Sequence, residues 1–138
     1  MKNFFAPFTF FCLCILLSMC FTNCSDNDDS TVDVDSRFVG VWERDESVSG
    51  VVEQIYTLVL NADGSASYSW FRNSKTVGNS AHDSNGKWRY DELVNHIITD
   101  CTTSATGSTV ILDVINITST TLVVKQEGTN KSKTYMKK

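Results

Sequence analysis

Beyond residue 37, the chain alternates between short apolar runs and polar turns, which is typical of β-strands. No window holds a sustained 3.6-residue hydrophobic period, so helices are not expected. Glycines and small polar residues separate runs rich in Val, Ile, Thr, Tyr and Trp, which strands favour. The pattern predicts eight strands, at residues 38–44, 51–60, 66–71, 86–91, 96–101, 109–117, 121–126 and 132–136.

The short connections between these runs favour a meander, in which each strand pairs with the next. The turn at residues 61–65 is one example, because Gly64 can supply the positive φ that a tight hairpin needs. Closing a meander removes the open edges of the sheet. We therefore expect an all-β fold, a single eight-stranded antiparallel up-and-down barrel. The connection at residues 73–85 is the exception, and its polar composition predicts a long loop.

The first 23 residues show a different pattern, that of an export signal. Lys2 precedes an apolar run at residues 4–17, and small or polar residues lead on to Cys24. Extended to residue 21, the run has 18 residues, the lower limit for a membrane-spanning helix. Pro7 and the lack of basic residues after the run weaken that alternative. In both interpretations residues 25–138 lie outside the cytoplasm.

Two cysteines near the end of this segment are candidates for lipidation. Cys20, preceded by Leu17 and Ser18, has the better local lipobox. The acidic sequence directly after Cys24, Ser-Asp-Asn-Asp-Asp, resembles the export signal of surface lipoproteins of the Bacteroidetes phylum. We therefore expect lipidation at Cys24, with Cys20 as the alternative and a cleaved but non-lipidated signal as another.

Charge divides the chain after the signal peptide, residues 1–23, into two parts. Residues 24–36 hold five aspartates and no Lys or Arg, and are expected to form an extended, lipidated acidic tether. Residues 37–138, the expected barrel domain, hold 11 acidic and 11 basic residues and no basic stripe for nucleic acid. With Cys24 lipidated, Cys101 is alone in this domain, so no intrachain disulfide is expected.

Four short motifs, taken in order, resemble the lipocalin-like (calycin-type) domains of Bacteroidetes lipoproteins. They are Gly40-Val41-Trp42, the hairpin at residues 58–65, Gly86-Lys87-Trp88-Arg89-Tyr90, and the turn at residues 117–122. The resemblance covers residues 37–138 and implies a calycin-like barrel. Together with the export signal, it implies a lipid-anchored protein of the outer membrane, exposed at the cell surface. It implies little about the ligand, because this fold carries many functions.

Five aromatic residues share one parity within their predicted strands, so we expect them on one face inside the barrel. They are Trp42, Tyr68, Trp70, Trp88 and Tyr90. One interpretation is that they line a pocket for a small apolar ligand. The other is that they fill the barrel core, with Trp42 as a plug at its closed end.

The other reactive residues do not indicate an enzyme, a metal or a cofactor. His82 and Asp83 are adjacent in the predicted loop, whereas His96 and Cys101 lie apart from them, with no ligand or nucleophile–base spacing. The prediction is a non-enzymatic, membrane-anchored protein that binds a small apolar molecule in its barrel. The alternative is an interaction protein with a filled core, which meets an envelope protein through its outer surface or residues 73–85.

Overall fold

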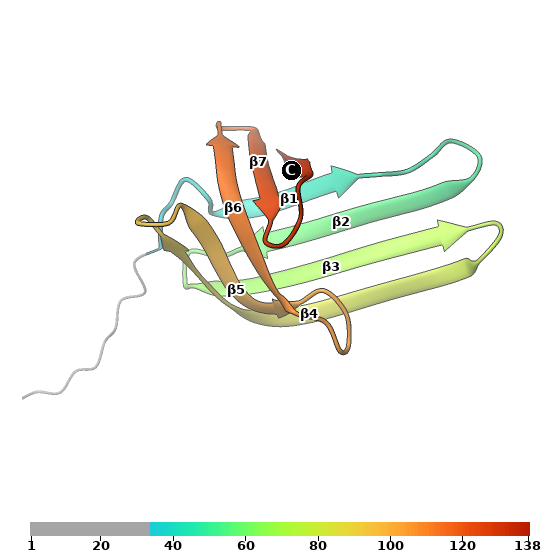
Figure 1. The fold of residues 1–138 in the computed structure, drawn as a ribbon, viewed down its shortest axis with the longest axis horizontal. Coiled ribbons are helices and arrows are strands. Elements are labelled where there is room, and N and C mark those ends of the chain that lie inside the picture. The colour runs from blue at the N-terminus through green and yellow to red at the C-terminus, as the bar shows by residue number, and fades with distance from the viewer. Residues whose placement is uncertain (1–33) are drawn as a thin grey trace, which may run out of the picture. The chain divides into compact units, whose positions relative to one another are not determined.

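The computed structural model describes residues 34–138, which form one closed sheet of eight strands (Figure 1). The strands are β1 (Gly40–Asp45), β2 (Val52–Leu60), β3 (Ser65–Ser74), β4 (Gly78–Asp91), β5 (His96–Thr102), β6 (Thr109–Ile117), β7 (Thr121–Gln126) and β8 (Ser132–Lys137). Each strand pairs antiparallel with the next, and β8 pairs with β1. The predicted all-β fold, a single eight-stranded antiparallel barrel, is therefore confirmed.

The predictions for the first part of the chain fall outside the described residues. They comprise the signal peptide at 1–23, the lipidation of Cys24 and most of the acidic tether. Within the described part, no helix is long and apolar enough to cross a membrane.

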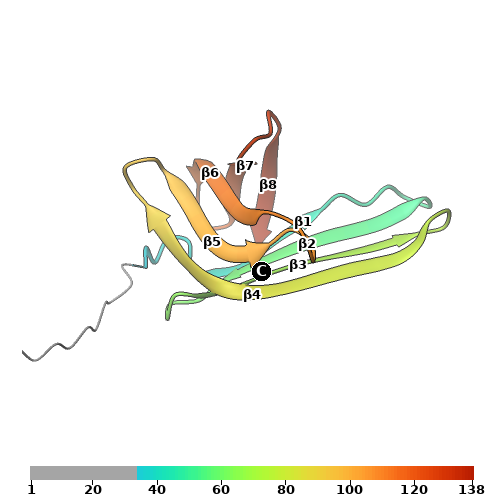
Figure 2. The same cartoon turned by 60° about the horizontal axis from the view of Figure 1, so that its bottom comes forward.

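The long loop predicted at residues 73–85 is wrong, because most of this segment belongs to the hairpin of β3 and β4. β3 runs to Ser74 and β4 begins at Gly78, which pairs with Ser74 and takes a φ of +84° after the turn. The hairpin extends beyond the other strands, together with β2 (Figure 2). Residues 78–81 are all exposed, so neither face of this stretch has to carry apolar side chains. Its composition is therefore as polar as that of a loop, which explains the wrong prediction.

Apolar side chains from all eight strands fill the centre of the barrel. Trp42 on β1 is fully buried, and its indole Nε1–H donates a hydrogen bond to the Phe38 carbonyl at 2.7 Å. Trp88 on β4 is also buried and donates to the Asn61 carbonyl at 2.8 Å. Each indole therefore keeps a polar partner, which is the usual condition for burying tryptophan in a core.

β4 curves along its length (Figure 2), and Gly86 lies where it changes partner. Residues up to 87 pair with β3, and Trp88 is the first residue that pairs with β5. A Cβ atom at Gly86 would lie 2.9 Å from Asp100 Cβ and 3.0 Å from the backbone nitrogen of Cys101. The two strands approach too closely here for any side chain, which explains the glycine.

The barrel closes through a short seam between β1 and β8. Two residue pairs are in register there, Trp42 with Lys137 and Glu43 with Met136. The Lys138 backbone N–H adds a hydrogen bond to the Val41 carbonyl at 3.0 Å. Every other strand pairing joins strands that are consecutive in the chain, so this seam is the one strand pairing between distant parts of the described sequence.

Candidate functional site

A pocket of about 380 Å³ opens at the end of the barrel where β1 and β7 finish and β8 begins; we call it the mouth pocket. Its lining comes from six strands and the β5–β6 connection, and combines aromatic, amide and hydroxyl groups with three cations. The lining residues are Arg44, Gln54, Tyr56, Tyr68, Trp70, Arg72, Ser80, Thr103, Gln126 and Lys133. None of these described residues is a carboxylate.

The residues that line the mouth pocket lie in successive rows across neighbouring strands. Each row forms because residues opposite each other on antiparallel strands have side chains on the same face of the sheet. The rows, from the core outward, are Trp42–Leu58–Tyr68 and Arg44–Tyr56–Trp70 on β1, β2 and β3, then Gln54–Arg72–Ser80 on β2, β3 and β4. The barrel interior therefore changes from apolar to cationic within two rows.

Arg44 is held between aromatic rings at the base of the mouth pocket. The centre of its guanidinium lies 3.9 Å from the Tyr56 ring centroid and 5.1 Å from that of Tyr135. The side chain is only 11 % exposed, and its Nη1 lies 3.6 Å from Glu46 Oε1. Cation–π contact and a carboxylate at the margin of hydrogen-bond range thus stabilise a nearly buried charge.

Glu46 forms ion pairs with two of the three cations, Arg44 and Lys133. It accepts a hydrogen bond from Lys133 Nζ and faces Arg44. Burial alone would raise the pKa of Glu46, but the hydrogen bond from Lys133 and the charge of Arg44 lower the pKa below its usual value. Glu46 is therefore ionised at neutral pH, and one negative charge is shared by two positive ones.

Arg72 forms no ion pair with any carboxylate of the described residues. It lies opposite Gln54 on β2 and Ser80 on β4, both of which line the mouth pocket. Among residues 34–138, two side-chain N–H groups are buried without a hydrogen-bond partner, Arg44 Nε and Arg72 Nε. Buried donors of this kind are costly, and such exceptions often mark functional positions.

The five aromatic residues predicted to share a face occupy three different environments. Tyr68 and Trp70 line the mouth pocket, whereas Trp42 and Trp88 are buried in the core. Tyr90 lies towards the opposite end of the barrel, among residues that do not contact the pocket. The structure thus brings two of the five predicted ligand-lining residues to the mouth pocket.

Two of the three aromatic residues that line the mouth pocket, Tyr68 and Trp70, are constrained by their surroundings. The Trp70 indole Nε1–H donates to the Thr103 carbonyl at 3.0 Å, which ties β3 to the β5–β6 connection. Tyr68 is almost fully buried, and burial raises the pKa of its hydroxyl. Tyr68 therefore remains neutral, and its ring packs against the core.

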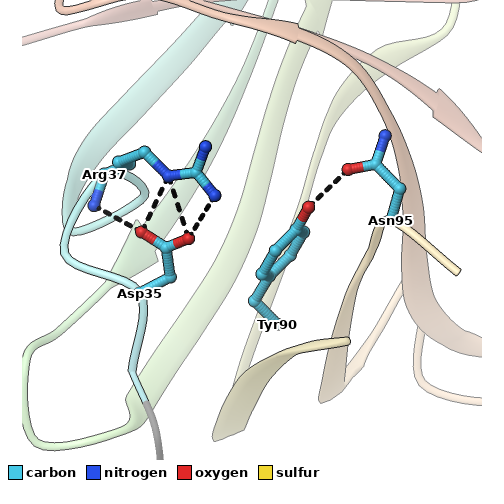
Figure 3. Close-up of polar contacts among 4 residues, drawn as sticks. All are labelled: Asp35, Arg37, Tyr90 and Asn95. Atoms are coloured by element: carbon cyan, nitrogen blue, oxygen red, sulfur yellow. Dashed lines mark hydrogen bonds and ion pairs between the residues drawn. The ribbon is translucent and has the colours of Figure 1, made fainter. Parts of the chain in front are cut away.

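Tyr90 belongs to a cluster of side chains that includes Arg37, Phe38 and Asn95; Figure 3 shows its polar contacts. Its ring packs against Phe38 with centroids 4.6 Å apart, and the Arg37 guanidinium lies 5.8 Å from its centroid. Its hydroxyl donates to Asn95 Oδ1, while Arg37 forms an ion pair with Asp35 that lowers the pKa of that carboxyl. Every member of this cluster already has a partner within it, which is typical of a structural cluster.

His82 and Cys101, two of the reactive side chains considered in the sequence, have structural surroundings. His82 Nε2 lies 2.9 Å from the Thr102 carbonyl oxygen, and Cys101 is fully buried. Burial raises the pKa of the Cys101 thiol, which disfavours the nucleophilic thiolate. Within residues 34–138, no three potential metal ligands come together.

The charged residues of the mouth pocket were not among those predicted from the sequence. The signal was present, because Arg44 and Arg72 each follow an inward-facing tryptophan, Trp42 or Trp70, by two residues. Residues two apart on a strand share a face, so the same parity that selected the aromatic residues also selects these arginines.

These features define a class of protein: a closed eight-stranded antiparallel β-barrel, consistent with a lipocalin-like fold, with a cationic pocket at one end. No protein family, curated protein or solved structure matches the chain at a significant level.

Proposed function

We propose that the protein is a non-enzymatic, lipocalin-like lipoprotein of the cell envelope that holds a small molecule in the mouth pocket. One observation carries this proposal, the pocket of about 380 Å³ at the end of the barrel. Its volume falls within the range of small-molecule sites, and barrel mouths are a common location for them. An eight-stranded barrel is also about wide enough for one small ligand.

The lining of the pocket calls for a different ligand from the apolar one expected from sequence. Three of the lining residues, Arg44, Arg72 and Lys133, carry positive charge. A wholly apolar ligand would cover these groups without compensating them, at a large cost in desolvation. A ligand with a polar part as well as an apolar part fits this lining better.

Native mass spectrometry of the protein purified from its natural host tests the proposal. We expect a bound small molecule on the wild type and none on Ser80→Trp, which places an indole at a position that lines the mouth pocket. Asn79→Trp is the matched control, because residue 79 is exposed and points to the other face of β4. The same unliganded mass for wild type and Ser80→Trp would contradict the proposal.

The proposed location follows from the start of the chain. Cys24 stands directly before an acidic stretch, and we propose that it carries the lipid that anchors the protein to the outer membrane, with the barrel at the cell surface. Multiple acyl chains on one cysteine give stable attachment, whereas a single chain gives marginal attachment.

Fatty-acid labelling of growing cells tests the choice of cysteine. We expect wild type and Cys20→Ala to incorporate the labelled fatty acid and Cys24→Ala to lose it, because acylation needs the thiol of the modified cysteine. Persistent labelling of Cys24→Ala, with loss in Cys20→Ala, would move the anchor to Cys20.

A second candidate function, interaction with an envelope protein, is favoured by an exposed apolar surface. Val48 and Val51 are each 55 % exposed and Val77 is 76 % exposed. They lie on adjacent connections, because Lys75 donates its backbone N–H to the Val51 carbonyl at 3.4 Å. The sequence-based alternative placed such contacts on the outer surface or at residues 73–85, and the exposed Val77 lies within that segment, at the tip of the β3–β4 hairpin.

A further inference from the structure

We infer that the mouth pocket selects a small organic anion with a planar apolar part, whose carboxylate or phosphate group lies against Arg44, Arg72 and Lys133. This inference rests on the proposed function, because it names the ligand class of the same pocket.

Local charge is the first argument. The pocket lining holds three cations, and the one carboxylate paired with any of them is Glu46, so the described residues around the pocket leave an excess of two positive charges. Residues 37–138 as a whole carry equal numbers of acidic and basic residues. The positive charge is therefore concentrated at the pocket, where it attracts anions and focuses their approach.

The burial of Arg44 is the second argument. A nearly buried guanidinium whose carboxylate is shared with Lys133 is only partly compensated. An anion in the pocket would supply the missing negative charge at short range, where the local dielectric strengthens the attraction. Tyr56 and Tyr135 already hold the guanidinium in place, so little further ordering is needed when an anion binds.

The unpartnered donors are the third argument. Arg44 Nε and Arg72 Nε are both buried without an acceptor among the described residues. Both arginines therefore keep a donor that the barrel itself does not satisfy, and Arg72 has no ion-pair partner among the described residues, which leaves its charge available to an oxyanion. Arginine is suited to this role, because its planar fork matches carboxylate and phosphate groups.

The aromatic lining argues for a planar apolar part on the same ligand. Tyr56 and Trp70 are opposite each other on β2 and β3, in the same row as Arg44 on β1. Rings beside cations suit a molecule that carries its charge at one end and a flat apolar body at the other.

Titration with matched aromatic probes tests this inference on the ¹⁵N-labelled full chain in a nonionic detergent. Benzoate and phenyl phosphate carry the anion, and benzamide is the neutral counterpart of benzoate. The signals to follow are the three tryptophan indole N–H groups, of which Trp70 lines the pocket while Trp42 and Trp88 are buried controls. We expect an anion to shift the Trp70 signal at concentrations about tenfold lower than benzamide, at a fixed ionic strength near 0.15 M.

The arginine variants complete the test. Arg72→Met keeps most of the side-chain volume and should weaken anion binding about tenfold, the usual effect of losing one charged hydrogen bond. Arg89→Met is the control, because Arg89 is exposed on β4 away from the pocket. Arg44→Met should weaken anion binding by a similar factor. If Arg44→Met does not fold, the result for Arg72→Met alone tests the role of the arginines.

Each outcome points to one conclusion. The inference is supported if benzoate or phenyl phosphate binds more strongly than benzamide, and if this preference is lost in Arg72→Met and kept in Arg89→Met. The anion that binds more tightly then identifies the preferred group, carboxylate or phosphate. Equal shifts with benzoate and benzamide would overturn the anion selectivity and leave the proposed small-molecule function intact. No shift of Trp70 with any probe would also overturn the inference, while the bound mass on the native protein decides the proposed function separately.

Discussion

Replacing Trp42 with Ala is expected to lower the free energy of unfolding by about 3–5 kcal/mol. Trp42 is fully buried at the centre of the barrel, so the substitution leaves a cavity between strands that cannot collapse without breaking their pairing. It also removes the hydrogen bond from Nε1 to the Phe38 carbonyl and leaves that acceptor buried. Urea unfolding of the full chain, followed by far-UV circular dichroism, measures the change.

Trp70→Ala is the matched control, because the same side chain is removed from the pocket instead of the core. Trp70 is only partly buried, and its loss would enlarge a pocket that already opens to water. We expect less than about half of the destabilisation of Trp42→Ala. Equal losses for the two variants would contradict the distinction between a filled core and an open mouth.

Replacing Gly86 with Ala is expected to cost about 1–3 kcal/mol, the usual range for forcing extra atoms into a packed site. The added methyl group would meet Asp100 Cβ at 2.9 Å and backbone atoms of β5 at 3.0 Å, so β4 and β5 must move apart. Backbone atoms cannot rotate out of the way as a flexible side chain can. The same unfolding measurement, read as a shift of the urea midpoint, reports this cost.

Asn85→Ala is the control for Gly86→Ala. Asn85 is the preceding residue on β4 and its side chain is exposed, so its substitution should change stability by no more than about 0.5 kcal/mol. If Gly86→Ala were as stable as Asn85→Ala, the close approach of β4 and β5 would not be a constraint on this strand.

The barrel could be predicted because its turns and alternation are local features of the sequence. β6 and β7 begin and end at the predicted residues, since each is a short run rich in Val, Ile and Leu between clear turns. The exception is the first part of β4, at residues 78–85. Its residues are polar on both faces, so no alternation distinguishes it from a loop, and only its pairing with β3 reveals a strand.

The mouth pocket could be predicted only in part, because depth along the barrel is not a property of a single strand. Parity correctly placed Tyr68 and Trp70 inside, but it could not separate them from Trp42, which is deeper. Depth depends on how strands are offset against their neighbours. Arg44 was overlooked for a different reason, because charged residues are ordinarily expected to face water.

The short seam between β1 and β8 has a consequence for how the chain folds. Seven of the eight strand pairings form between neighbours in sequence, whereas the seam joins Trp42 to Lys137 and encloses almost the whole domain. The entropy of closing a loop grows with its length, so this contact is the costliest to form and comes late. Until then the meander is an open sheet, and both outer strands are free edges that another copy can pair with. The last step of folding is therefore also the step that most limits aggregation.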